Sequence, residues 1–238
     1  MNLRTRRRAL MSQKSTIVYV HGTWEDLFRA IDAGTYATEY AVGETLSLDL
    51  GSFGNKTFKI VAMNKDALAD NSGNAPVTLL ATTALSGKHR MNPAAQGSSG
   101  NYTVGTGGVG GWEHSEMRSY LINSVLPAIP ANVRQRIKAT KRYSNSVNTA
   151  GTAVSNAMTS DSVWIPSRRE VGDSNGETSG TVYLNSTTRT AISTAINATW
   201  YTRSATSYTS FRYVQSNGNL TAAAADTTRW IILGFCVG

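Results

Sequence analysis

The last forty residues of the chain constrain its fold most. They begin at Trp200 and close with an apolar run over residues 230–237. Between residues 205 and 229, thirteen of twenty-five positions are Ala, Ser or Thr, with a few large polar or aromatic residues among them. Tyr and Arg are the usual anchors of binding surfaces, and small polar residues adapt to a partner. The pattern predicts a rigid apolar frame that displays a binding surface rather than a catalytic site.

The composition favours a loop-rich domain that contains β-structure. With 238 residues, 40% of them hydrophobic, the chain can bury a sizeable core. Only 16% of the residues are charged, while Gly, Ser, Thr and Asn are abundant. This balance argues against a helical bundle and for one large domain, or for one domain with an appendage.

Positive charge is concentrated at the N-terminus. Five of the 23 basic residues, and no acidic residue, lie in the first fourteen positions. The rest of the chain holds 18 basic and 15 acidic residues, a net charge of +3. We therefore expect residues 1–15 to form a flexible basic tail, and we expect no specific nucleic-acid surface on the body. Contact of the arginine run with nucleic acid or anionic lipid is the alternative.

The single cysteine and the hydropathy pattern exclude several classes. Cys236 lies in an apolar run, which predicts a small buried thiol in a strand and rules out a disulfide within the chain. No apolar stretch is long enough for a membrane span, and the one after the arginine run is too short for a signal peptide. We therefore expect no membrane insertion and synthesis in the cytoplasm without a signal peptide.

Periodicity predicts a short strand and a helix in residues 16–40. Thr23 can cap this helix, and Trp24, Leu27, Phe28 and Ile31 recur with helical spacing. We expect the unit to pack against the main domain or a neighbouring subunit, and to serve in attachment.

Residues 41–238 are predicted to form the main domain. Alternation or apolar runs predict strands at 45–50, 57–62, 77–82, 162–166, 211–215 and 230–237, with a hairpin turn at 217–218. A helix should start near residue 115 and end at Pro127 and Pro130, with a shorter helix over 131–137. Residues 171–182 should form a polar loop.

Known catalytic and cofactor motifs are weak in this chain. The glycine spacing Gly105-x-Gly107-x-x-Gly110 matches the dinucleotide-binding motif, but no apolar strand leads into it. His21, His89 and His114 are isolated and lack metal-ligand spacing. We therefore expect no catalytic residue, no metal and no cofactor.

Three blocks, each pairing a Trp with nearby Arg and Ser residues, resemble a domain found in many gut-bacterial and phage proteins. The blocks start at residues 111, 163 and 200, and the resemblance covers roughly residues 41–238. It rests on Trp112, Ser115, Arg118, Leu121, Trp164, Pro166, Ser167, Glu170, Trp200, Arg203, Ser204, Phe211, Val214, Gly218, Gly234 and Phe235.

The resemblance implies an α+β fold of the C-type-lectin-like kind, loop-rich, with small antiparallel sheets and two helices. Within this fold, the family resembles the branch that is shared by formylglycine-generating enzymes and the variable proteins of diversity-generating retroelements. The arginine-rich start followed by a Trp-Glu-Asp-Leu-Phe helix is similar to phage structural proteins.

In the retroelement branch, mutagenesis rewrites codons near the C-terminus. The resemblance thus implies a variable ligand-binding face at about residues 201–231, made of Tyr201, Tyr208, Arg212, Tyr213, Asp226, Arg229 and Trp230. It also implies a fixed scaffold made of Trp112, Arg118, Trp164, Trp200, Arg203 and Phe211.

The resemblance further implies a phage or prophage virion-surface or receptor-binding protein. Its partners would be a host cell-surface protein or glycan, other virion proteins through the N-terminal region, and sister copies in a homo-oligomer such as a trimer. One alternative is a structural virion protein that uses the same face for subunit packing. A formylglycine-generating enzyme is disfavoured because the chain lacks the cysteine pair, and a sugar-binding calcium lectin because it lacks the Glu-Pro-Asn or Gln-Pro-Asp motif.

Overall fold

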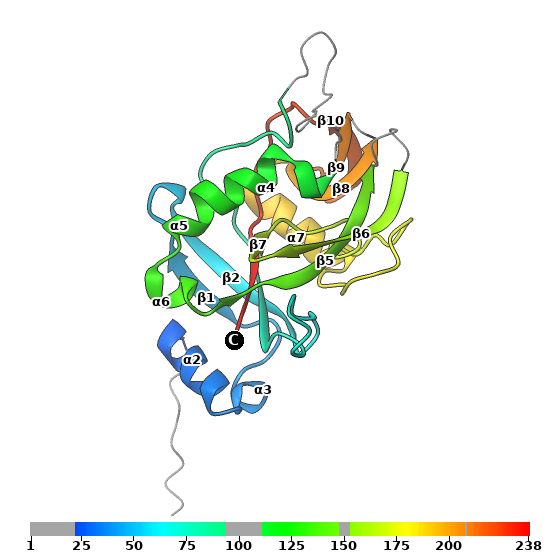
Figure 1. Ribbon diagram of the computed structural model, residues 1–238. Helices are drawn as coiled ribbons and strands as arrows, with labels where there is room; N and C mark the ends of the chain where they lie inside the picture. Colours follow the sequence, from blue (N-terminus) through cyan, green and yellow to red (C-terminus); the bar gives the residue numbers. More distant parts are fainter. Residues whose placement is uncertain (1–21, 94–110, 148–152, 208) are drawn as a thin grey trace, which may run out of the picture.

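An antiparallel sheet of six strands forms the centre of the protein (Figure 1). The computed structural model describes residues 22–93, 111–147, 153–207 and 209–238. The predicted strands near residues 45, 57 and 77 are confirmed, and Leu46 and Leu48 point into the core at alternate positions. In spatial order the strands are β1 (Thr45–Asp49), β2 (Asn55–Met63), β3 (Val77–Ala81), β11 (Gly234–Val237) and β4 (Ile137–Lys138), with β7 (Val163–Trp164) also paired to β11.

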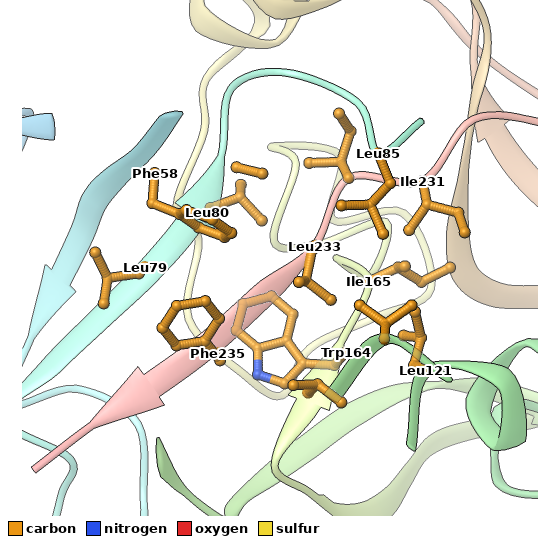
Figure 2. Packing of buried hydrophobic residues seen from close by; sticks show 14 of the residues in the cluster. Phe58, Leu79, Leu80, Leu85, Leu121, Trp164, Ile165, Ile231, Leu233 and Phe235 are labelled. Carbon is orange, nitrogen blue, oxygen red and sulfur yellow. The ribbon is translucent and has the colours of Figure 1, made fainter. Parts of the chain in front are cut away.

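The C-terminal strand β11 lies in the middle of this sheet and of the core. Phe235 packs against Phe58 of β2 with a ring-centroid distance of 4.9 Å. Figure 2 shows Leu233 and Phe235 between the side chains of β2 and β3 and the ring of Trp164. The prediction of a strand over 230–237 was too long: β11 begins at Gly234. Residues 231–233 are buried but run as extended chain beside residues 81–85.

The N-terminal helix α2 (Trp24–Asp32) is part of the same core. The Thr23 side chain accepts a hydrogen bond from the backbone of Asp26, which confirms the predicted cap. The Trp24 ring lies 6.0 Å from that of Phe235, and its Nε1 donates to the carbonyl of Ser47 at 2.8 Å. The unit therefore packs against the main domain, and a short helix α3 (Tyr36–Glu39) connects it to the sheet.

A run of short helices covers the core after the first gap in the described chain, residues 94–110. Ser115 caps α4 (Glu116–Tyr120), which continues through a π-helical turn at Leu121–Val125 into α5 (Leu126–Ala128). The helical run ends at Ala128, between Pro127 and Pro130 as predicted, and Ile129 is extended before Pro130. Pro130 precedes α6 (Ala131–Arg134), which is shorter than the predicted helix over 131–137.

Several elements were not predicted from the sequence, among them two long strands and a helix in the middle of the chain. The strands β5 (Thr140–Val147) and β6 (Ala153–Asp161) form a hairpin, and α7 (Ser186–Ile196) is a helix of eleven residues. Most of β6 is exposed or half-buried, so it lacks the apolar alternation that marks a strand. Only Ile192 and Ser193 of α7 are buried, although the capping box of Asn185 and Thr188 is a recognisable start signal.

The C-terminal region that was predicted to bind a ligand folds as a separate small sheet. It comprises β8 (Trp200–Ser207), β9 (Ser210–Val214) and β10 (Leu220–Ala224), all antiparallel, and the β5–β6 hairpin runs beside it (Figure 1). Gly218 makes the predicted turn between β9 and β10 with a φ of 85°.

The architecture is therefore mixed α+β, with small antiparallel sheets and short helices. The predicted tail 1–15, the strand-like run 17–20, the glycine loop 105–110 and Tyr208 lie outside the described residues. Among the helices that the structure describes, none is long and apolar enough to cross a membrane.

Candidate functional site

Arg203 joins the small C-terminal sheet to neighbouring segments through buried hydrogen bonds. Its side chain on β8 is completely buried. The guanidinium donates to both carboxylate oxygens of Glu170 at 2.6 and 2.7 Å. It also donates to the backbone carbonyls of Ile165 at 2.7 Å and Tyr143 at 2.9 Å. A planar group with several donors can join segments in this way, so the prediction that Arg203 ties loops together is confirmed.

A second buried arginine, Arg142 on β5, extends this network and was not predicted. Its Nη1 lies 3.3 Å from carboxylate oxygens of both Asp66 and Glu170. Its guanidinium stacks 3.9 Å from the ring centroid of Trp164. Two buried arginines thus share two buried carboxylates, which balances the charge inside the protein. The polar sequence around Arg142 carries no apolar pattern that would have indicated its burial.

Cys236 is a buried thiol in a strand, as predicted. Its Sγ accepts from Nη2 of Arg142 at 2.9 Å and lies 3.3 Å from the Thr78 hydroxyl. Burial raises the pKa of the Cys236 thiol, and the charge of Arg142 offsets only part of this rise. The side chain therefore stays neutral at ordinary pH, which argues against a nucleophilic role.

The tryptophans of the predicted scaffold hold the outer segments to the core. Nε1 of Trp112 donates to the Asp161 carboxylate at 2.8 Å, and Nε of Arg118 reaches the same carboxylate at 2.6 Å. Nε1 of Trp200 donates to Ser193 of α7 at 3.0 Å. Trp164 and Phe211 are also completely buried, whereas Arg118 remains partly exposed.

Tyr201 belongs to the buried scaffold and not to the exposed face. Its side chain is buried. Its hydroxyl lies within hydrogen-bond distance of two backbone carbonyls, that of Ala224 at 2.8 Å and that of Thr227 at 2.9 Å. Burial raises the pKa of Tyr201 to about 12. The prediction placed Tyr201 on the exposed face, whereas the structure buries its side chain, because sequence composition does not reveal that backbone carbonyls at the end of β10 and in the following turn accept from its hydroxyl.

Arg229 and Tyr213 form a preassembled pair at the surface. Both are half-buried, and the Arg229 guanidinium lies 3.5 Å from the centroid of the Tyr213 ring. Nη1 of Arg229 also donates to the Thr199 hydroxyl at 2.8 Å. The pair is thus held in place by its neighbours, and it still presents exposed surface.

Arg212 lies on the other side of the small sheet from Tyr213. Neighbouring residues of a strand point to opposite faces, and both belong to β9. Arg212 lines a hollow of about 160 Å³ together with Arg168 and Ser204. The predicted single face is therefore divided between two sides of the sheet.

The two remaining predicted face residues lie apart from Arg212. Trp230 lines a wider hollow of about 410 Å³ with Lys56, Leu85 and Ile196. Asp226 is half-exposed in the turn that follows β10.

Of the described histidines, His89 has local side-chain partners. His89 stacks on Tyr120 with a centroid distance of 3.9 Å and lies 3.5 Å from the Glu116 carboxylate. No group of three or more His, Cys, Asp or Glu side chains in residues 22–93, 111–147, 153–207 and 209–238 is placed to hold a metal ion.

Sequence comparison places the chain in a family. A family model described as a domain of unknown function, DUF6273, matches residues 77–237, from the start of β3 to the end of β11. No curated protein and no solved structure matches the chain. The match covers well over half of the 238 residues, so the chain belongs to the DUF6273 family.

Proposed function

We propose that this protein binds a host surface protein or glycan through its C-terminal region, at about residues 201–231, as part of a phage or prophage particle. The observation that carries the proposal is the Arg229–Tyr213 pair, stacked at 3.5 Å and half-exposed. Arg and Tyr are enriched among the few residues that dominate binding energy at protein surfaces. Their fixed geometry supports a binding role, because fewer rotamers are lost when the ligand is bound.

The buried frame beneath the pair supports the same proposal. Arg203 and Glu170 join β8 to the loop after β7, and Trp200 joins it to α7. A surface supported in this way keeps its shape when exposed side chains change. The residues of β10 are mostly Ala and Thr, half-buried or exposed, so substitution there would leave the core intact.

The finer parts of the proposal are a C-type-lectin-like fold and diversification by a retroelement. The mixed α+β architecture with small antiparallel sheets is compatible with the first. The second predicts a near-copy of the 3′ coding sequence next to a reverse-transcriptase gene. Sequencing the neighbouring DNA tests this, and an intact locus without such a copy would remove the diversification part.

The binding experiment compares adsorption of labelled protein to a panel of bacterial strains. Arg229→Ala and Tyr213→Ala should each weaken adsorption about 30-fold, the effect of losing roughly 2 kcal/mol. The matched controls are Arg136→Ala and Tyr36→Ala. Arg136 also stacks on an aromatic ring, 5.2 Å from that of Phe28, and Tyr36 is likewise half-buried against the core. Both controls lie around the N-terminal helices, far from the C-terminal sheet (Figure 1).

The controls should adsorb like the wild type. Equal adsorption of all four variants would reject this face as the binding surface. A change in oligomer mass in light scattering, without a change in adsorption, would instead support subunit packing as its role.

A further inference from the structure

Two arginines line the hollow between the β5–β6 hairpin and β8. The hollow has a volume of about 160 Å³ and includes Asn145 of β5, Ala153 of β6 and Ser204 of β8. Arg168 comes from the loop after β7 and Arg212 from β9. They are 44 positions apart in sequence, so only the fold brings them together. One water molecule needs only about 10–15 Å³ of such volume, so the hollow has room for a compact group of several atoms.

The positive charge of this hollow is only partly balanced. Nη2 of Arg168 pairs with Asp173 at 2.9 Å. Among the described residues, no carboxylate lies within ion-pair distance of Arg212, and the Nε atoms of both arginines lack a hydrogen-bond partner. Burial and then the charge of Arg168 lower the pKa of Arg212, whereas Asp173 acts in the opposite direction. One acid thus faces two cations that repel each other.

We infer that this hollow is a subsite for a compact oxyanion, a carboxylate or phosphate group carried by the ligand. Guanidinium groups match the two oxygens of such groups with paired hydrogen bonds, and partial burial strengthens the attraction. The bound anion would supply the charge that Arg212 lacks within the described chain. The inference deepens the proposed function, on which it rests for the ligand's source, because Arg212 belongs to the proposed binding region.

The test uses two small anions and a neutral sugar. Sodium glucuronate and sodium phosphate are titrated into the ¹⁵N-labelled protein at constant ionic strength, with glucose as the neutral match for glucuronate. The Nε–Hε signals of Arg168 and Arg212 should shift and saturate, with a dissociation constant on the order of 1 mM for ligands this small. Glucose should shift neither signal. The two anions separate a carboxylate from a phosphate as the preferred group.

Substitution of Arg212 identifies the site. Arg212→Gln should weaken anion binding about tenfold or more, because removing one partner of a charged contact is costly. Arg212→Lys keeps the positive charge but loses the paired donors of the guanidinium, so it should bind the anions with intermediate affinity. This variant replaces Arg212→Gln in the test if the Gln variant fails to fold. Arg136→Gln, a surface arginine at the N-terminal helix, should bind like the wild type. No saturable shift with either anion, or equal affinity in the Arg212 variants, would overturn the inference.

Adsorption measurements keep this inference distinct from the proposed function. If Arg229→Ala abolishes adsorption while neither anion binds, the subsite is wrong and the proposed function stands. If Arg212→Gln abolishes anion binding while Arg229→Ala adsorbs normally, the subsite is supported and the proposed binding face is rejected.

Discussion

At the scale of single residues, the interior is organised by a few buried charges. Arg203 and Arg142 each contact the Glu170 carboxylate, and Asp66 adds a second acid. Removing one member of such a network leaves the others buried without full compensation. Exposed or half-exposed charges such as Arg212 lack this dependence, so the structure separates charges that stabilise the fold from charges that it does not need for stability.

Arg203→Ala should therefore lower the free energy of unfolding by about 3–5 kcal/mol, because the buried Glu170 carboxylate loses two short charged hydrogen bonds and keeps the longer contact with Arg142. Arg212→Ala should change it by roughly 0.5 kcal/mol or less. Urea denaturation of both variants checks this pair of values. Similar stability of the two variants would show that Arg203 does not hold the frame.

The raised pKa of Tyr201 predicts that the folded protein loses stability at alkaline pH. Burial raises its pKa to about 12, whereas the ordinary tyrosine value is 10.0. The folded state therefore holds the phenol proton more tightly than the unfolded state. The stabilisation is complete below pH 10 and is lost as the pH rises through about 12, an effect of roughly 2–3 kcal/mol.

Tyr201→Phe should make stability fall less steeply between pH 9 and 11.5 in urea denaturation. At pH 7 it should cost about 1–3 kcal/mol, since the carbonyls of Ala224 and Thr227 lose a donor. Tyr36→Phe, which alters an exposed hydroxyl, is the control. An unchanged slope in Tyr201→Phe would mean that this side chain does not titrate with unfolding.

At the scale of elements, the close approach of β11 and β7 fixes the centre of the sheet. Gly234 lies opposite Trp164 in the strand register. A Cβ at Gly234 would come within 2.3–2.6 Å of three atoms of the Trp164 ring. The glycine is thus required for close packing between strands, which is a contact that local sequence does not show.

Gly234→Ala should destabilise the protein by about 1–3 kcal/mol through overpacking. Trp164→Ala should cost about 3–5 kcal/mol by leaving a cavity. In a Trp164→Leu background, where the ring is gone, Gly234→Ala should cost clearly less than alone, because neighbouring sites couple. Thermal and urea denaturation of the single and double variants checks this, and strict additivity would contradict the contact.

At the scale of the whole molecule, the N-terminal helix completes the core. The family match begins at Val77, yet α2, β1 and β2 share one hydrophobic cluster with β11. Trp24, Leu27 and Ala30 of α2 are buried in it. The stable unit is therefore longer than the matched region.

Two truncations should behave differently. A chain that starts at Ser15 should melt within a few degrees of the full chain, because the removed segment is basic and has no periodic apolar face. A chain that starts at Ala41 should lose most of a typical domain stability of about 5–15 kcal/mol, since burial of three α2 side chains is lost. Thermal melting compares them. Normal melting of the shorter chain would show that α2 is not needed for folding.

The sequence by itself determined the local features of this protein. Side-chain periodicity along β1 and α2, the Thr23 cap, the Gly218 turn and the apolar context of Cys236 each predicted what the structure shows. Trp164 and Arg203 were also expected to be structural. These features depend on residues a few positions apart, and backbone geometry converts their spacing directly into faces and turns.

Only the tertiary structure decided which distant side chains meet and which are covered. It buried Tyr201 beneath the β10 segment and placed Arg142 between Asp66 and Glu170. It also put Arg212 beside Arg168, on the opposite side of the sheet from Tyr213. The physical reason is that burial and charge pairing depend on contacts between strands far apart in the chain. A polar or aromatic residue in a sequence carries no mark of the partner that will cover it.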